Sequence, residues 1–149
     1  MLPNPGVATG PLPPTAEGKA RLEEVFGIPA ADRYLLYPVR AIRRKNIGEA
    51  VLCSLLAGLD VWIGGTLAPT SPAEKAPYEG GKQRTVQRRF RCVWETGEAG
   101  RLTLAQNLAA ADALLSTNIA EGFGMVFLES LVSRPNLAGP KPAGNYRRF

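Results

Sequence analysis

The sequence contains no histidine and only two cysteines among its 149 residues. Without histidine, zinc sites lose a common ligand, and catalytic triads lose their usual base. Cys53 and Cys92 lie far apart in the apolar contexts VLCSLL and RCVW, which favours two reduced core thiols over a disulfide. Any chemistry must therefore come from carboxylates, cations, hydroxyl groups and the backbone.

Long apolar runs are missing as well. No stretch reaches the roughly eighteen apolar residues that a membrane-spanning helix needs. The opening MLPNPGVATGPLPPT has neither the basic nor the apolar region of a secretion signal. With 45% hydrophobic and 21% charged residues, the composition is that of a single globular domain. We therefore expect a cytoplasmic protein.

Positive charge is abundant and clustered. The net charge is +5 and the sequence pI is about 9.6, which favours an anionic partner without saying whether it is a polymer, a membrane surface or a small phosphate compound. The basic residues gather in RAIRRK at 40–45, in KQRTVQRRFR at 82–91 and in Arg147 and Arg148 of the tail. We interpret the 82–91 cluster as a solvated helix face.

Helical and strand patterns alternate along the chain. Buried strands are predicted in YLLYPV (34–39), DVWIGG (60–65), RCVWE (91–95) and DALLS (112–116), and helices at 16–27, 47–58, 102–111 and about 123–133. Residues 66–90 fit either one helix or a helix after a long loop. This alternation predicts an α/β fold, a parallel sheet with helices on both faces joined by right-handed crossovers.

Two unusual segments follow strands of this predicted sheet. RAIRRKN follows the first strand and TNIAEGFG follows the fourth, so both are expected to border one crevice at the carboxyl ends of the strands. Arg40 and Lys45 would bring two cations to that crevice. The helix that opens near Phe123 would add unpaired backbone N–H groups and the positive end of its dipole. Together these groups suit a diphosphate.

The residues around Phe123 indicate what else the crevice could hold. Gly122 and Gly124 lack a Cβ atom, which lets a phosphate or a sugar approach the main chain closely. Glu121 and Glu129 supply carboxylates, which accept hydrogen bonds well from the vicinal hydroxyls of a sugar or a ribose. A diphosphate combined with such diols describes a nucleotide sugar.

Together these motifs resemble the sequence pattern of a known family. EGFGMVFLE looks like the Glu, seven residues, Glu signature of retaining GT-B glycosyltransferases of the group 1, family 4-like type, and RAIRRKNI is similar to their Arg, four residues, Lys element. NPGV resembles their interdomain linker, VWIGG their second strand and glycine turn, and AAADALLS the helix and strand before the signature. The resemblance runs collinearly along nearly the whole chain. It implies the Rossmann-like C-terminal half of a GT-B fold.

The family pattern implies a role for each matching residue. Arg40 and Lys45 would bind the donor diphosphate and stabilise its charge as it departs, and Glu121 would hold hydroxyls of the transferred sugar. The implied catalytic residues are Arg40, Lys45 and Glu121, and the implied donor-binding residues are Gly122, Phe123, Gly124, Met125, Val126 and Glu129, the last on the ribose diol. The donor is a nucleotide-diphosphate sugar that acts as substrate, and neither a metal nor another cofactor is implied.

The resemblance also sets expected boundaries. Residues 1–15 would be a remnant of the interdomain linker, 16–140 the nucleotide-sugar-binding domain and 141–149 a basic tail. Asn118 stands where the family usually has serine, and Arg134 where it has glycine. On this family pattern, the 149 residues would lack the N-terminal acceptor-binding domain and would leave little room for the last units of the C-terminal domain. We therefore expect this fragment to bind the donor but to transfer little or no sugar, and peripheral membrane association would concern only the full enzyme.

Two other functions fit the sequence less well. A non-catalytic basic module could bind RNA or another polyanion through 40–45 and 82–91, but the sequence shows no aromatic platform or nucleic-acid motif, so no nucleic acid is expected. A dinucleotide oxidoreductase would need a Gly-x-Gly-x-x-Gly turn after the first strand, and none is present. Trp94 to Gly97 could stack a nucleobase, although a buried tryptophan is favoured.

Overall fold

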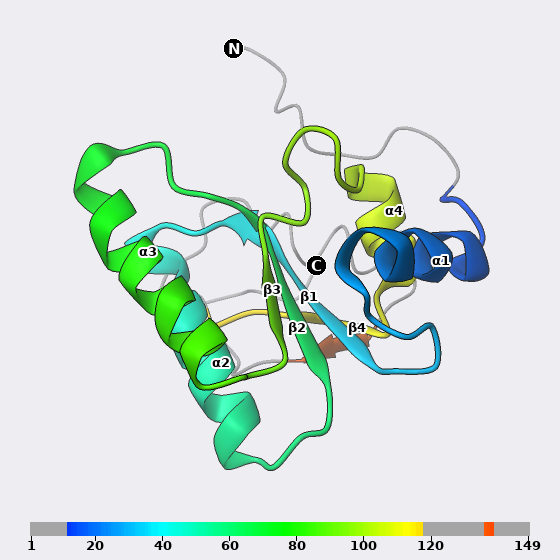
Figure 1. The fold of residues 1–149 in the computed structure, drawn as a ribbon, viewed down its shortest axis with the longest axis horizontal. Coiled ribbons are helices and arrows are strands. Elements are labelled where there is room, and N and C mark those ends of the chain that lie inside the picture. The colour runs from blue at the N-terminus through cyan, green and yellow to red at the C-terminus, as the bar shows by residue number, and fades with distance from the viewer. Residues whose placement is uncertain (1–11, 118–135, 139–149) are drawn as a thin grey trace, which may run out of the picture.

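A computed structural model describes residues 12–117 and 136–138. The helices are α1 (Thr15–Phe26), α2 (Ile47–Leu56), α3 (Pro72–Gln87) and α4 (Leu104–Ala110), with a 3-10 turn η1 (Arg43–Lys45) before α2. The strands are β1 (Tyr34–Arg40), β2 (Trp62–Leu67), β3 (Cys92–Trp94), β4 (Ala113–Leu115) and β5 (Asn136–Ala138). Helices and strands alternate as the sequence predicted, and the stretch left open is resolved as helix α3 (Figure 1).

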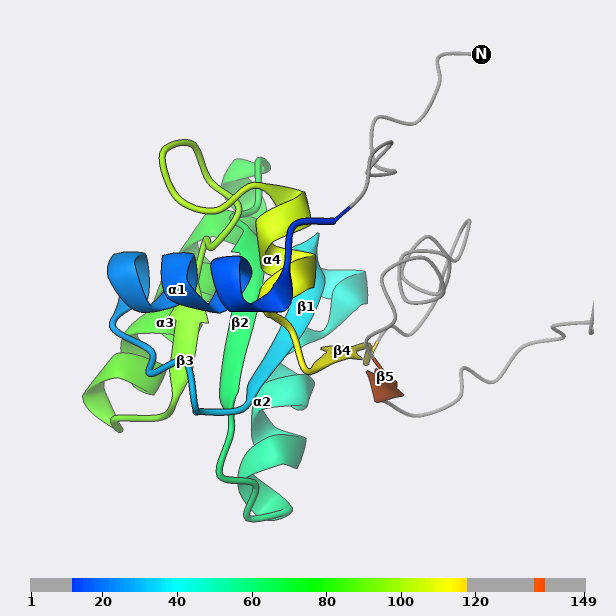
Figure 2. The same cartoon turned by 90° about the vertical axis from the view of Figure 1, so that its right-hand side faces the viewer.

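The five strands form one parallel sheet in the order β3-β2-β1-β4-β5. From β1 the chain adds β2 and β3 on one side, and then crosses back through α4 to place β4 on the other side of β1 (Figure 2). The strand order therefore reverses between β1 and β4. In open α/β sheets, ligands bind outside the carboxyl ends of the strands at such a switch point.

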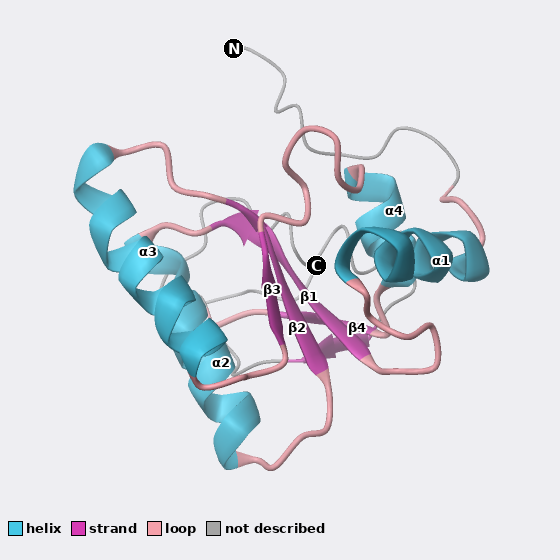
Figure 3. Cartoon of the chain, in the orientation of Figure 1, coloured by secondary structure: helices cyan, strands magenta, loops and turns pink. Residues whose placement is uncertain are grey.

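Helices cover both faces of the sheet (Figure 3). α1 and α4 lie on one face, over a core that includes Leu22, Leu36 and Leu114. α2 and α3 lie on the other face, where the buried cluster includes Tyr37 and Ile63. The predicted Rossmann-like architecture is confirmed.

Local signals set the ends of several helices. Gly27 ends α1 in the left-handed conformation at φ 68°, which a glycine adopts without steric cost. Thr103 and Gln106 form a capping box at the start of α4, with each side chain bonded to the other residue's backbone N–H group. These caps agree with the helices expected at 16–27 and 102–111.

Helix α2 buries only the first part of its apolar repeat. Apolar residues recur at every fourth position, at Ile47, Val51, Leu55 and Leu59. Val51 is buried and Ile47 packs against the same core cluster, as the repeat predicts, but Leu55 and Leu59 are 41% and 50% exposed. Leu56 is 79% exposed. The buried residues of α2 are Ala50, Val51 and Ser54.

Other expectations can be checked in the described ranges. Both cysteines are free thiols, as expected, but Cys53 is exposed and only Cys92 is partly buried, so the expectation of two core thiols was wrong for Cys53. No helix in residues 12–117 is long and apolar enough to cross a membrane.

Candidate functional site

The segments that leave β1 and β4 are joined by one buried side chain. Tyr37 of β1 is fully buried, and its hydroxyl group donates a hydrogen bond to the main-chain carbonyl of Lys45. The same hydroxyl accepts a hydrogen bond from the backbone N–H of Thr117 at 3.1 Å. The basic loop after β1 and the chain after β4 therefore meet at the switch point between these strands.

Thr117 strengthens this junction from the β4 side. Its Oγ1 donates to the carbonyl of Asn46 at 2.8 Å and lies 3.4 Å from the carbonyl of Lys45. Asn46 has φ 54°, a left-handed conformation that asparagine tolerates better than most residues. The turn from η1 into α2 is thus held against the end of β4. Since Thr117 precedes Glu121 by four residues, the predicted Glu signature begins close in sequence to this junction.

Arg40 and Lys45 both lie on the segment that leaves β1. Arg40 is the last residue of that strand, and its Nη1 donates to the carbonyl of Ala68 at 2.7 Å. Lys45 is 8% exposed at the end of η1. Arg43 and Arg44 between them are exposed. The two predicted cations are therefore the less exposed members of the basic cluster.

The remaining predicted site residues lie outside the described ranges. These are Glu121, Gly122, Phe123, Gly124, Met125, Val126 and Glu129, together with the family departures at Asn118 and Arg134. Their roles stay predictions. The helix expected at about 123–133 also falls outside the described residues.

The loop after β3 carries a charged cluster that the sequence did not reveal. Glu95 has φ 63°, and its carboxylate accepts hydrogen bonds from Lys82 Nζ at 2.6 Å and from the Tyr78 hydroxyl at 3.2 Å. Arg101 Nη1 lies 3.4 Å from the other carboxylate oxygen. Burial would raise the pKa of Glu95, but the hydrogen bond and charge of Lys82 outweigh it and hold the pKa below its usual value. The cluster fixes the exit of β3 against α3.

Trp94 is half-buried and packs against α3. Its Nε1 donates to Thr85 Oγ1 at 2.9 Å, and its ring meets Tyr78 edge-on with ring centroids 5.7 Å apart. The interpretation as a buried tryptophan holds only in part, because Trp94 is half-buried and lines a pocket of about 260 Å³ together with Tyr78 and Lys82. The 82–91 cluster is likewise mostly solvated, with Arg84, Arg88 and Arg89 exposed.

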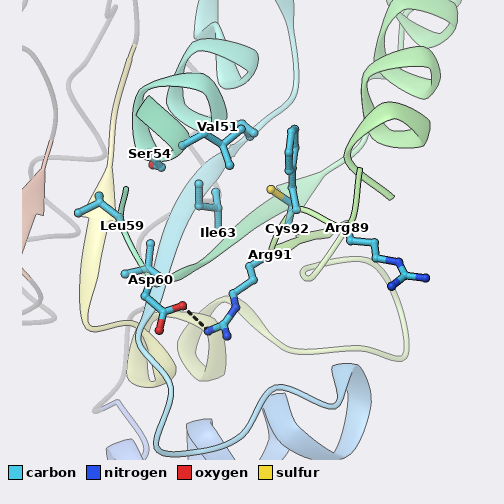
Figure 4. Close-up of a pocket in the computed structure, with 11 residues that line it drawn as sticks. Val51, Ser54, Leu59, Asp60, Ile63, Arg89, Arg91 and Cys92 are labelled. Atoms are coloured by element: carbon cyan, nitrogen blue, oxygen red, sulfur yellow. Dashed lines mark ion pairs between the residues drawn. The ribbon is translucent and has the colours of Figure 1, made fainter. Parts of the chain in front are cut away.

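A pocket of about 220 Å³ lies at the opposite end of the sheet (Figure 4). Val51 and Leu59 line it from α2 and the turn that follows, and Asp60 pairs with Arg91 there at 2.8 Å. Asp60 and Arg91 precede β2 and β3, so this pocket is at the amino ends of the strands. Burial raises the pKa of the Cys92 thiol in its wall to about 11, which keeps that thiol protonated at neutral pH.

A wider hollow of about 460 Å³ lies between the starts of α2 and α3. Asn46 and Gly48 line it from the α2 side, and Glu74 and Tyr78 line it from α3. Glu74 Oε1 accepts a hydrogen bond from the backbone N–H of Arg43 at 3.0 Å, so α3 also braces the basic loop. Among the described residues, no group of three or more Cys, Asp or Glu side chains could hold a metal ion.

No family model matches the sequence. The chain is 30% identical over 112 residues to the mannosylglucosyl-3-phosphoglycerate synthase of Petrotoga mobilis, a match that covers 74% of this chain. The chain spans 22% of the length of that relative.

Several solved structures share the fold. The C-terminal domain of a group 1 glycosyltransferase, LpcC of Francisella tularensis, matches with a TM-score of 0.67 and 17% identity over 90% of this chain and 70% of that domain. The chain has the fold of a GT-B glycosyltransferase C-terminal domain. Sucrose-phosphate synthase of Thermosynechococcus elongatus aligns with a TM-score of 0.64 and 20% identity over 86% of this chain and 31% of that enzyme. HepE of Anabaena, solved with UDP and glucose, aligns with a TM-score of 0.63 and 18% identity over 84% of this chain and 33% of that protein.

The helices and strands of this GT-B fold follow the order that the sequence predicted. The predicted resemblance to GT-B glycosyltransferases is confirmed, and the basic loop and the end of β4 meet where strand order reverses. Sequence reasoning missed Tyr37 and Thr117, which make this junction. Tyr37 lies in an apolar strand and Thr117 in a polar segment just after a strand. Neither pattern marks its hydroxyl group as part of a junction.

Proposed function

We propose that this chain is the donor-binding part of a retaining, metal-independent glycosyltransferase. It would bind a nucleotide-diphosphate sugar whose sugar is passed to an acceptor held by a separate N-terminal domain. The observation that carries the proposal is the junction at Tyr37, because its hydroxyl group bonds both the Lys45 turn and Thr117. The junction supports the proposal because it joins the cationic loop to Thr117, which precedes Glu121 by four residues in the sequence.

Sugar transfer would depend on stabilising the negative charge of the departing diphosphate. Transfer leaves a nucleoside diphosphate with growing negative charge, and fixed cations stabilise such charge without needing to reorganise. Arg40 and Lys45 would supply these cations, Glu121 would bind hydroxyls of the sugar, and Glu129 would bind the ribose. The neighbours support a nucleotide donor, since one was solved with UDP and glucose and another, starch synthase IV of Arabidopsis thaliana, with ADP and acarbose.

Catalysis requires more than the donor site. An acceptor must be held against the donor, and in a two-domain enzyme this happens in the cleft between the domains. We infer that the chain alone binds donors and transfers little or no sugar. We place the reaction in the cytoplasm, with peripheral membrane contact left to the full enzyme.

The test is a calorimetric titration of UDP, ADP and GDP into the full chain. One nucleotide should bind clearly, and Arg40→Ala and Glu129→Ala should each weaken that binding at least about tenfold, or about 1.4 kcal/mol. Arg88→Ala is the matched control, because it removes one exposed arginine at the end of α3 and should leave binding unchanged.

A basic module for polyanions would behave differently. Binding would then follow charge, fall steeply with salt, weaken equally in Arg88→Ala and ignore Glu129→Ala. That pattern, or the absence of binding by all three nucleotides, would contradict the proposal.

A further inference from the structure

A chain of hydrogen bonds links the loop after β3 to the last residue of β1. Arg40 Nη1 donates to the carbonyl of Ala68 at 2.7 Å, and the backbone N–H of Ala68 donates to Glu98 Oε1 at 3.1 Å. Both main-chain groups of Ala68 are thus engaged, one by a cation and the other by a carboxylate. The position of the Arg40 guanidinium therefore depends on Ala68, and that of Ala68 depends on Glu98.

Ala68 needs this support because the sheet ends just before it. The pairing of β1 with β2 is irregular between Tyr37 and Arg40, where Pro38 has no N–H group to donate. The last backbone bond between the two segments runs from the N–H of Ala41 to the carbonyl of Leu67 at 2.9 Å. Ala68 lies one residue beyond that bond, so a side chain from the next loop holds it instead.

Glu98 is well placed to act as an anchor. The backbone N–H of Gly97 continues the sheet by donating to the carbonyl of Thr66 at 2.9 Å. Glu98 itself donates its N–H to the carbonyl of Glu95 at 3.1 Å and accepts from the N–H of Arg101, also at 3.1 Å. Its backbone is therefore fixed on both sides, and its half-buried carboxylate can hold Ala68 in one position.

We propose that Glu98 is a positioning residue for the donor diphosphate, acting through Ala68 on the guanidinium group of Arg40. The inference rests on the proposed function, in which Arg40 binds that diphosphate. One N–H donor of the guanidinium group bonds the carbonyl of Ala68, which restricts the orientation of the group, and its other N–H donors would meet phosphate oxygens.

We call the path from Glu98 through Ala68 to Arg40 the relay. It predicts a change in binding opposite in sign to the change that simple electrostatics predicts. Glu98 is an anion, so removing its charge near a diphosphate binding site would strengthen binding if charge alone mattered. If Glu98 acts as an anchor, Glu98→Ala instead weakens binding. Glu98→Gln keeps an oxygen acceptor for the Ala68 N–H group while it removes the charge, so it should restore binding.

The test is a double-mutant cycle, measured with whichever of UDP, ADP and GDP binds the wild-type chain. Glu98→Ala should weaken binding about five- to tenfold, which is the loss expected from one misplaced charge-assisted contact. Glu98→Gln should stay within about twofold of wild type. In the Arg40→Ala background, Glu98→Ala should have almost no further effect, because the group it positions is gone. Glu23→Ala removes an exposed acid from α1 and is the control for charge.

Several outcomes would overturn the relay. Unchanged or tighter binding in Glu98→Ala, equal losses in Glu98→Ala and Glu98→Gln, or a full loss on the Arg40→Ala background would each do so. A second measurement, amide hydrogen exchange, needs no ligand. The amide hydrogen of Ala68 should exchange at least about tenfold faster in Glu98→Ala than in Glu98→Gln. If no nucleotide binds the wild-type chain, the proposed function fails along with the diphosphate role. Unchanged exchange at Ala68 would refute the relay alone.

Discussion

On the sheet face that α1 and α4 cover, large side chains are completely buried, whereas on the α2 and α3 face a row of leucines remains exposed. Leu36 and Leu114 have no exposed surface, and α1 approaches α4 so closely that a Cβ atom at Gly18 would lie 2.7 Å from the backbone nitrogen of Ala110. Across the sheet, Leu56 is 79% exposed, and hollows open between α2 and α3.

The two faces of the sheet therefore differ in role: the α1 and α4 face stabilises the domain, and the α2 and α3 face can bind a ligand. The α1 and α4 face supplies a close-packed core, whose cost of opening is high. The basic loop after β1 leads into α2, on the looser face, where local rearrangement around a ligand costs less. Tyr37 and Thr117 then hold one end of this looser face in a fixed geometry at the switch point.

The largest contrast should come from truncating one leucine on each face. Leu114→Ala removes a completely buried side chain and should lower the free energy of unfolding by about 2 to 5 kcal/mol. Leu56→Ala should change it by no more than about 0.5 kcal/mol, because that side chain is already in water. Urea denaturation measures both values. Equal losses would mean that α2 is covered in solution.

Two neighbouring glycines of β2 sharpen the same comparison. A Cβ atom at Gly64 would overlap the hydroxyl group of Tyr34 in the α1 and α4 core, so Gly64→Ala should destabilise the domain by about 3 kcal/mol. A Cβ atom at Gly65 would meet the flexible end of Ile47 at 2.9 Å on the other face, so Gly65→Ala should cost about 1 kcal/mol or less. Thermal unfolding of both variants would show whether the ranking holds.

Tyr37→Phe tests the fixed end of the looser face. The change leaves the carbonyl of Lys45 and the N–H of Thr117 without the hydroxyl group, and should cost about 1 to 3 kcal/mol. Amide exchange at Thr117 should also become faster, whereas Leu114 in the opposite core should keep its protection. Unchanged exchange at Thr117 would show that the junction does not depend on Tyr37.

The smallest effect concerns acid stability at Glu95. Because its pKa is lowered in the folded chain, its contribution is complete above the unfolded pKa and is lost as pH falls through the folded value. Glu95→Gln should therefore destabilise the domain near neutral pH, and the difference from wild type should shrink as pH falls below about 4.5. Chemical denaturation at several pH values measures this difference. A gap independent of pH would assign the loss to packing.

Much of the fold could be predicted because strands and most helices carry local patterns. YLLYPV and DVWIGG are short apolar runs beside clear helix signals, and their alternation implies a parallel sheet. The extent of helix α3 stayed open because Pro77 lies inside it and Thr85 is its one buried residue, so it shows no apolar period that marks its start. The exposed side of α2 could not be foreseen either, since leucine is usually buried.

The site was predictable only in part, for a physical reason. Arg40 and Lys45 stand out as cations at a strand exit, and the structure places both on the segment leaving β1. The junction that orders this segment joins Tyr37 to Thr117, which are 80 residues apart in sequence. Glu98 and Ala68 are likewise 30 residues apart. Such pairs depend on how the strands are ordered in space, which no local pattern records.

The central claim is that a nucleoside diphosphate binds where the chain leaves β1 and β4. An NMR titration of the full chain with UDP, ADP and GDP tests it directly. We expect one of them to shift the backbone amide signals of residues 41–46 and of Thr117, and to leave those of 52–59 unchanged. Shifts confined to the pocket of Figure 4 at the amino ends of the strands, or no shifts with any nucleotide, would contradict the claim.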